Sequence, residues 1–322
     1  MIESTSTRKM TLLSIQNLKV HFHTEDGAVR AVNDVDLVIE EGETLGLIGE
    51  TGCGKTVLGL AILRLLSENT KVEGKILYKG KDLLKLNEDE IRKIRGKEIA
   101  MIFQNPLTSM NPVLTIGTQI SEPFELHQGL KKKDAIPKVI EMLKSVRISS
   151  PSERIKEYPH EFSGGMRQRA MIAMGLACEP SLIIADEPTK GLDVTIQAQV
   201  VELMKELTTN SKTSMLLITH DLGVAAELCD NIAVMYPGEI VEYADIKEFF
   251  KSPKHPYTQG FLDSLPGRGL KPMDGMSPSL IDLPEGCKFH PRCPFAREKC
   301  KSKRPEMVEI GKKHLVRCFL YD

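Results

Sequence analysis

Short, continuous apolar runs alternate with longer stretches of helical periodicity along most of the chain. Apolar runs of strand length occur at residues 44–48, 99–103, 182–185 and 215–219. Helical patterns occur at residues 55–66, 133–146, 164–178, 194–208 and 221–229. Continuous apolar runs suit strands that are covered on both faces, so the pattern predicts an α/β fold with a mostly parallel core sheet. The patterns at 12–20 and 35–39 indicate an antiparallel β subdomain.

Two changes in the pattern predict the domain organisation. The strand pattern stops between Gln104 and Ser163, which indicates an inserted helical subdomain at about residues 105–180. From residue 253 onward prolines and glycines become frequent. We therefore expect a main domain over residues 1–252 and a small, irregular C-terminal extension over residues 253–322, docked on the main domain but outside its sheet.

Composition excludes several classes of protein. The chain has 322 residues and a formal net charge of −1, whereas a nucleic-acid-binding domain usually carries a clear basic excess. We therefore expect no nucleic acid as a partner. No apolar run approaches the ~18 residues that a membrane-spanning helix needs, and the first residues lack a signal-type apolar run. These features predict a cytosolic protein whose membrane role, if it has one, goes through a partner.

Residues 49–56 read G-E-T-G-C-G-K-T, which fits the phosphate-binding pattern G-x-x-x-x-G-K-[ST]. The pattern follows an apolar run and opens a predicted helix, so backbone N–H groups and the helix dipole would face an anion. A plain glycine turn is the alternative interpretation. Lys55 should reach the β- and γ-phosphates, and the Thr56 hydroxyl should coordinate Mg²⁺. The expected nucleotide-binding residues of this loop are Gly49, Thr51, Gly52, Cys53, Gly54, Lys55, Thr56 and Val57.

Polar side chains follow three of the predicted strands. Asp186 and Glu187 end the run at 182–185, and a carboxylate at that edge can hold Mg²⁺ while its neighbour polarises a water as general base. Gln104 follows the run at 99–103 and could reach the metal or the water, and His220 follows the run at 215–219 and could contact the γ-phosphate or the water. We expect Glu187, His220, Gln104 and Lys55 to be catalytic, and Thr56, Gln104 and Asp186 to bind Mg²⁺.

The order of these motifs resembles that of the ABC transporter ATPase family over nearly the whole chain. The deciding element is Ser163-Gly164-Gly165-Met166-Arg167-Gln168-Arg169, which is similar to the signature motif of that family. The resemblance implies that Ser163, Gly164 and Gly165 face the γ-phosphate of ATP held by a second subunit, in a head-to-tail dimer. It also places Phe22 where an aromatic residue stacks on adenine, although a core aromatic in an early strand is the alternative.

Three further segments resemble the peptide/nickel uptake branch of the family: residues 104–112 (QNPLTSMNP), Phe162 to Met166 (FSGGM) and residues 255–260 (HPYTQG). This resemblance implies an ATPase that powers import of dipeptides or oligopeptides, with nickel or another small solute as the alternative. The implied partners are a second homologous ATPase subunit, two transmembrane permease subunits and, indirectly, an extracytoplasmic substrate-binding protein. The implied location is peripheral, at the cytoplasmic face of the cell membrane.

Four of the seven cysteines lie near the C-terminal end: Cys287, Cys293, Cys300 and Cys318. In a reducing cytosol such a group indicates metal ligands before disulfides. Zinc sites favour cysteine pairs two to four residues apart, and none occurs here, so the wider spacing favours an iron–sulfur cluster. The branch resemblance points to a [4Fe–4S] centre; Zn²⁺ and reduced thiols without metal remain the alternatives.

Rival functions fit less well. ABC ATPases of DNA repair insert long coiled coils or zinc modules before the signature, whereas the segment between Gln104 and Ser163 shows no sustained heptads and no basic stripe. Translation-associated ATPases usually carry two cassettes in one chain, and only one phosphate-binding motif is present. Intact Lys55, Asp186, Glu187 and His220 argue against a structural protein without hydrolysis.

Overall fold

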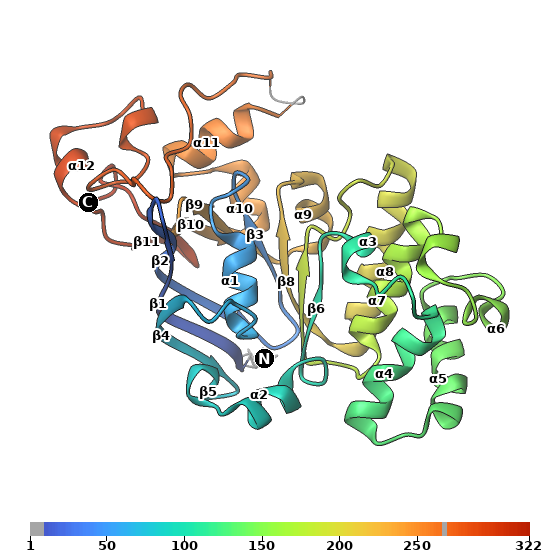
Figure 1. The fold of residues 1–322 in the computed structure, drawn as a ribbon. Coiled ribbons are helices and arrows are strands. Elements are labelled where there is room, and N and C mark those ends of the chain that lie inside the picture. Colours follow the sequence, from blue (N-terminus) through green and yellow to red (C-terminus); the bar gives the residue numbers. More distant parts are fainter. Residues whose placement is uncertain (1–9, 266–268) are drawn as a thin grey trace, which may run out of the picture.

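The computed structural model describes residues 10–265 and 269–322, which form a sheet-centred molecule with helices on its flanks (Figure 1). Its strands are β1 (Thr11–Thr24), β2 (Gly27–Glu40), β3 (Thr44–Ile48), β4 (Thr70–Tyr78), β5 (Lys81–Asp82), β6 (Ile99–Ile102), β7 (Leu182–Asp186), β8 (Ser214–Thr219), β9 (Asn231–Tyr236), β10 (Glu239–Asp245), β11 (Val308–Gly311) and β12 (His314–Val316). Its α-helices are α1 (Lys55–Ile62), α2 (Glu88–Ile94), α3 (Pro106–Ser109), α4 (Ile116–Gln128), α5 (Lys132–Ser145), α6 (Pro151–Arg154), α7 (Gly164–Leu176), α8 (Val194–Ser211), α9 (Leu222–Leu228), α10 (Ile246–Lys251), α11 (Pro256–Asp263) and α12 (Glu298–Ser302). None of these helices is long and apolar enough to cross a membrane.

The core sheet has eight strands in the order β11-β12-β10-β9-β3-β8-β7-β6. Strands β9, β3, β8, β7 and β6 are parallel, as the continuous apolar runs predict. Strands β10, β12 and β11 pair antiparallel, so the sheet is mixed. Because parallel strands run in one direction, the residues that follow β3, β7, β8 and β6 all emerge at the same edge.

A second, four-stranded antiparallel sheet has the order β2-β1-β4-β5. This confirms the antiparallel β subdomain, although β1 and β2 are longer than the patterns at 12–20 and 35–39 predict. Its inner face shares a hydrophobic core with the core sheet, in which Leu13, Val20 and Val35 pack with Leu47 and Leu58. The phosphate-loop helix α1 therefore lies between the two sheets.

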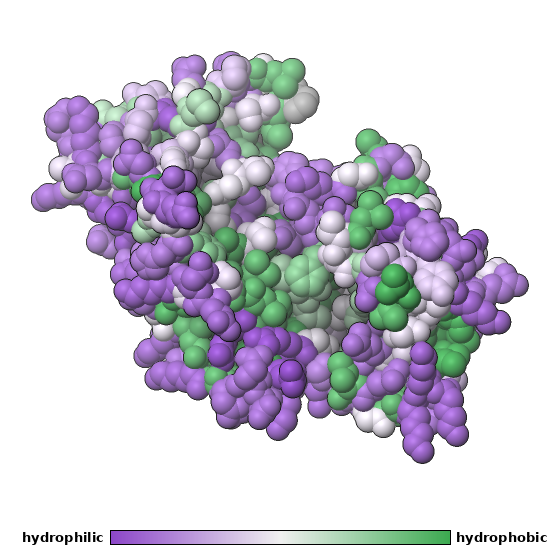
Figure 2. Space-filling model, in the orientation of Figure 1, coloured by the Kyte–Doolittle hydropathy of each residue, from purple (hydrophilic) through white to green (hydrophobic). Residues whose placement is uncertain are grey.

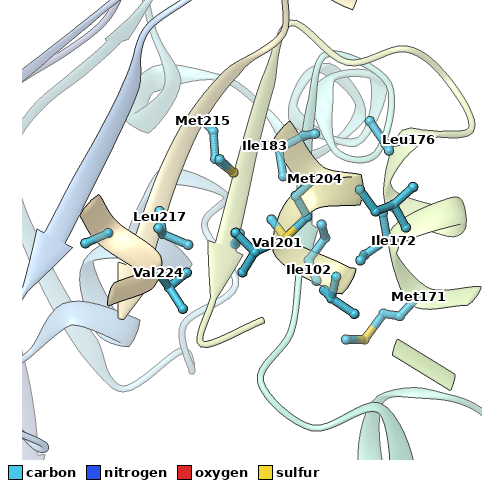
Figure 3. Close-up of a cluster of buried hydrophobic side chains, with 14 of the residues drawn as sticks. Ile102, Met171, Ile172, Leu176, Ile183, Val201, Met204, Met215, Leu217 and Val224 are labelled. Carbon is cyan, nitrogen blue, oxygen red and sulfur yellow. The ribbon is translucent and has the colours of Figure 1, made fainter. Parts of the chain in front are cut away.

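Helices α4, α5, α7 and α8 form a layer beyond β6 and β7 (Figure 1). Ile172 and Leu176 of α7 and Val201 and Met204 of α8 point toward Ile102 and Ile183 of the sheet (Figure 3). Gly175 permits this approach, since a Cβ there would lie 3.2 Å from Ile102 Cγ1. The apolar faces of α7 and α8 thus attach the helical layer to the sheet edge.

The C-terminal extension corrects one prediction. It does not lie outside the sheet, because β12 pairs with β10 in the register Glu242↔Val316 and Tyr243↔Leu315, and β11 pairs with β12. The extension is also not fully irregular, since it contains α11 and α12. Strands of three and four residues are too short to give a recognisable alternation in the sequence.

A buried carboxylate joins the extension to the sheet. Glu242 of β10 is fully buried, and its oxygens accept hydrogen bonds from the backbone N–H groups of Lys254 and His255, both at 2.8 Å. His314 Nε2 of β12 lies 2.8 Å from Glu242 Oε1. Burial alone would raise the pKa of Glu242, but these hydrogen bonds, led by the contact with His314, hold the pKa below its ordinary value.

Replacing this carboxylate should destabilise the protein. Glu242→Ala should lower the free energy of unfolding by about 3–5 kcal/mol, because removal of one partner leaves the other buried groups uncompensated. The stability that the Glu242 carboxylate contributes should be fully present above its ordinary pKa of 4.5. This contribution should disappear as pH falls through the lowered pKa of Glu242 in the folded state. Urea unfolding at neutral and acid pH measures both effects. Glu309→Ala, on the exposed face of β11, is the control and should change little.

Candidate functional site

The Gly49–Gly54 loop connects β3 to α1 and approaches neighbouring backbone closely. Gly49 has φ +155°, and a Cβ there would lie 2.1 Å from the carbonyl oxygen of Met235. Gly54 has φ +109°, and a Cβ there would lie 2.0 Å from the carbonyl oxygen of Ala31. Only glycine fits at these two positions. The glycines are therefore required by backbone contacts with β9 and β2, which a plain surface turn would not make.

Lys55 begins α1 and is buried, with its ammonium group turned toward the loop. Its Nζ donates hydrogen bonds to the carbonyl oxygens of Gly49 at 2.8 Å and Glu50 at 2.9 Å. Cys53 is also buried, and burial raises the pKa of its thiol. A buried thiol with a raised pKa is unreactive, so Cys53 acts as a packing residue in this loop.

Thr56 and Asp186 meet at the carboxyl edge of the sheet. Thr56 Oγ1 donates a hydrogen bond to Asp186 Oδ2 at 2.8 Å, although the two residues come from α1 and β7. Asp186 Oδ1 is buried and has no hydrogen-bond partner among the described residues. Burial raises the pKa of Asp186, against the opposing hydrogen bond from Thr56. An orphaned, buried carboxylate oxygen next to a hydroxyl is a site that suits a hard cation.

Glu187 and His220 face each other at the same edge. His220 Nδ1 lies 2.9 Å from Glu187 Oε1 and 2.8 Å from Oε2. Glu187 adopts φ +46°, a left-handed conformation that its backbone N–H supports by donating to the carbonyl oxygen of Ile218 at 2.8 Å. The Glu187 side chain is largely buried, whereas that of His220 is about half exposed. This backbone turn places the carboxylate of Glu187 within hydrogen-bond distance of His220.

Gln104 lies after β6 and borders a groove that also includes Gly164, Arg167, Lys190 and Leu192. Among the described residues its side chain makes no hydrogen bond to Thr56, Asp186 or Glu187. The structure thus brings Gln104 together with the start of α7 and with residues 190–192.

Ser163, Gly164 and Gly165 form the start of α7. Ser163 is the N-cap, and its Oγ accepts a hydrogen bond from the backbone N–H of Met166 at 3.3 Å. Ser163 and Gly164 are exposed, so the free N–H groups of this helix start face solvent. The phosphate loop follows β3, whereas α7 packs beside β6, and β8 and β7 separate these two strands. The Gly49–Gly54 loop and the start of α7 of one chain therefore lie apart.

Comparison with known proteins gives the family. An ABC transporter family model matches residues 32–190, and the model "Oligopeptide/dipeptide transporter, C-terminal region" matches residues 241–300. The chain is 48% identical to the dipeptide transport ATP-binding protein DppD of Bacillus subtilis, over 97% of this chain and 95% of that protein. It is 45% identical to the oligopeptide transport ATP-binding protein OppD of Haemophilus influenzae, over 96% of this chain and 97% of that protein. The chain belongs to the ABC transporter ATPases of the peptide transport branch.

Solved structures agree with this assignment. A dimeric post-hydrolysis structure of the ATP-binding cassette MJ0796, bound to ADP and phosphate, matches with a TM-score of 0.66 at 26% identity. The match covers 73% of this chain and 98% of the cassette. The ABC ATPase fold thus accounts for most of the chain, and the rest of the chain lies outside the match to that cassette.

The four cysteines of this ABC ATPase border one apolar cavity in the C-terminal extension. Cys287, Cys293, Cys300 and Cys318 line it together with Phe289 and Phe319, among others. Burial, and to a smaller extent the three neighbouring thiols, raise the pKa of Cys287 to about 12. Within residues 10–265 and 269–322, however, no group of three or more Cys, His, Asp or Glu side chains is arranged to hold a metal ion. The four thiols thus border the same cavity, but their side chains would have to turn toward a common centre to bind a metal ion.

One contact of the phosphate loop has no signal in the sequence. Glu50 occupies a variable position of the motif, yet its carboxylate pairs with Arg292 of the C-terminal extension. The residues are 242 positions apart, so no spacing rule connects them.

Proposed function

We propose that this ABC ATPase hydrolyses ATP to drive import of dipeptides and oligopeptides. The single observation that carries the hydrolytic part is the assembly of Thr56, Asp186, Glu187 and His220 at one sheet edge. The peptide part rests on the names of the relatives and on the matching C-terminal region. Nickel or another small solute remains the alternative cargo. We place the ABC ATPase domain at residues 1–252, with a helical subdomain at about residues 105–180, and the branch-specific extension at residues 253–322.

The phosphates of ATP would occupy the Gly49–Gly54 loop. Lys55 would exchange its two carbonyl partners for phosphate oxygens, and Thr51, Gly52, Gly54, Thr56 and Val57 would supply backbone N–H groups. Phe22 of β1 is half-buried and packs at the rim of the core between the sheets, so one side of its ring could contact adenine. The ammonium group of Lys55 would neutralise charge on the β- and γ-phosphates.

Thr56 and Asp186 fit a magnesium ion, because a hydroxyl oxygen and an unpartnered carboxylate oxygen are hard ligands. Mg²⁺, when bound, would neutralise negative charge on the phosphates. Glu187 would accept a proton from the attacking water, and His220 would hold the Glu187 carboxylate in position. Gln104 would approach this centre from the groove that it shares with Gly164.

A second homologous ATPase subunit is the proposed partner across ATP. The exposed helix start at Ser163 offers free backbone N–H groups, and it lies apart from the Gly49–Gly54 loop of its own chain. In a head-to-tail dimer each such helix start would close the nucleotide site of the other subunit.

Two transmembrane permease subunits would dock on the face that carries α3, at the cytoplasmic side of the membrane. The segment after Gln104 exposes large apolar side chains: Leu107 is 61% and Val113 75% exposed. Figure 2 shows hydrophobic surface in the hollow between the β subdomain and the helical layer, within a mostly hydrophilic face. Exposed apolar side chains next to Gln104 would connect permease movement to the nucleotide site.

Reconstitution tests the cargo. The chain should co-purify with membrane-spanning permease subunits. In liposomes that contain this complex and its binding protein, the ATPase rate should rise several-fold when a dipeptide or oligopeptide is added. Lys55→Ala should abolish both basal and stimulated rates. Stimulation by a nickel chelate and not by peptides would replace the cargo while leaving the ATPase in place. Stimulation by DNA instead would contradict the transport function.

We further propose that Cys287, Cys293, Cys300 and Cys318 hold a [4Fe–4S] cluster, with Zn²⁺ as the alternative. Thiolates are ligands for either group, and the four thiols border one apolar cavity, although their side chains would have to turn toward a common centre. A bound cluster would supply a covalent crosslink between the loop at Cys287–Cys300 and the C-terminal end. Cys318 follows β12, so such a crosslink would attach the loop to the core sheet.

Metal analysis tests the cluster. Protein made without oxygen should be brown and contain about four irons per chain. Cys293→Ser should lose the colour, because thiolates are the only ligands in the proposed set. Cys178→Ser, which changes a cysteine at the end of the signature helix, should keep it. Colourless protein with one tightly bound zinc would overturn the cluster and retain the metal-stabilised extension.

A further inference from the structure

The C-terminal extension holds the phosphate loop at Glu50 through two contacts. Arg292 Nη1 lies 3.1 Å from both carboxylate oxygens of Glu50. The backbone N–H of Glu50 donates a hydrogen bond to the hydroxyl oxygen of Tyr257 at 3.0 Å. The side chain and the peptide N–H of Glu50 are thus both bound by residues of the C-terminal extension.

Arg292 is itself firmly held. Its side chain is 7% exposed, its Nε donates to the carbonyl oxygen of Asp274 at 3.1 Å, and its Nη1 lies 3.4 Å from the Tyr236 hydroxyl. Its guanidinium also lies over the rings of Tyr236 and Phe289. An arginine fixed by hydrogen bonds and aromatic faces presents one geometry to its carboxylate partner.

The aromatic support beneath these contacts is continuous with the core. Tyr236 at the end of β9 packs against Tyr257 of α11, with ring centroids 4.5 Å apart, and against Phe289 at 5.2 Å. All three rings are almost completely buried. Glu50 is therefore attached to a rigid cluster and not to a surface loop.

Glu50 in turn contacts the lysine of the loop, because its carbonyl oxygen accepts a hydrogen bond from Lys55 Nζ at 2.9 Å. A shift of the Glu50 peptide would move the lysine that meets the phosphates. The Glu50 carboxylate also places negative charge in the loop that is proposed to bind the phosphates of ATP. The guanidinium of Arg292 offsets that charge. We propose that Arg292 is a positioning residue for the nucleotide site, through which the C-terminal extension sets ATP affinity; this rests on the proposed phosphate site.

The test compares ATP binding by full-length variants of equal metal content. Arg292→Gln should weaken ATP binding ~10-fold, a change that corresponds to ~1.4 kcal/mol. The same variant should raise the KM for ATP by a similar factor and change kcat little, because Glu187 and His220 lie on other elements. Arg292→Lys should recover part of the affinity by restoring the charge. Tyr257→Phe removes only the hydroxyl that accepts the hydrogen bond from Glu50 N–H, and it should also weaken ATP binding. This second variant tests the proposal even if Arg292→Gln fails to fold.

Arg304 offers a matched control. It also anchors the extension by ion pairs, but to Asp34 at 2.9 Å and Glu239 at 3.0 Å, neither of which belongs to the Gly49–Gly54 loop. Arg304→Gln should leave ATP affinity near the wild-type value. Equal affinity losses in Arg292→Gln and Arg304→Gln, or none in Arg292→Gln and Tyr257→Phe, would overturn the proposal. Retained ATP binding by Lys55→Ala would instead show that the phosphate site itself is misplaced.

Discussion

Glu187→Gln should bind ATP normally and lose nearly all turnover. Glutamine has the shape of glutamate and can keep a hydrogen bond with His220, but it cannot accept a proton from the attacking water. A general base typically contributes ~10²–10⁴-fold to the rate, so hydrolysis should fall by about that factor. Steady-state phosphate release and ATP binding, measured on the same preparation, separate the two effects.

The structure provides a matched control for this substitution. Glu179 also adopts a left-handed conformation, with φ +51° against +46° for Glu187, but its side chain is exposed outside the site. Glu179→Gln should therefore hydrolyse ATP at the wild-type rate. In the proposed head-to-tail dimer ATP lies between the subunits, so Glu187→Gln, which retains ATP, should also accumulate a dimer that size-exclusion chromatography detects. Near-wild-type hydrolysis by Glu187→Gln would remove the residue from the catalytic set.

The sequence was sufficient for the parts of the site that are local in the chain. The runs at 44–48, 182–185 and 215–219 become β3, β7 and β8 with ends within one residue of the prediction. Their order in a parallel sheet brings Lys55, Asp186 and His220 to one edge, which is why motif and strand patterns together located the site. Local periodicity carries this information because each strand is covered on both faces.

What the sequence did not show depends on long-range packing. The pairing of β12 with β10 joins residues 242 and 316, and no local pattern encodes which strand edge a three-residue strand will join. The Glu50–Arg292 contact is also a product of tertiary structure, since Arg292 is held against the rings of Tyr236 and Phe289, and Tyr236 comes from a distant part of the chain. The strand pairing and the contact both involve the C-terminal extension, where short elements leave little periodicity to read.

Two inactive variants should restore activity to each other if the nucleotide site is shared between subunits. Lys55→Ala removes the phosphate contact of its own chain, whereas Ser163→Arg blocks the helix start that would face the ATP of the partner. In a homodimer of either variant both sites are defective. In a mixed dimer one site combines an intact Lys55 with an intact Ser163, so ATPase activity should appear on mixing at high protein concentration.

Ser163 suits this experiment because it is exposed and its side chain makes one hydrogen bond, to the N–H of Met166. Loss of this cap should cost the fold only about 1 kcal/mol, and Asn87→Ala, which removes the cap of α2, controls for that loss. A mixture of wild type and Lys55→Ala shows whether a dimer with one intact site turns over. If that mixture is active while Lys55→Ala with Ser163→Arg stays inactive, each chain must complete its own site, and the separation of α7 from the phosphate loop would need another explanation.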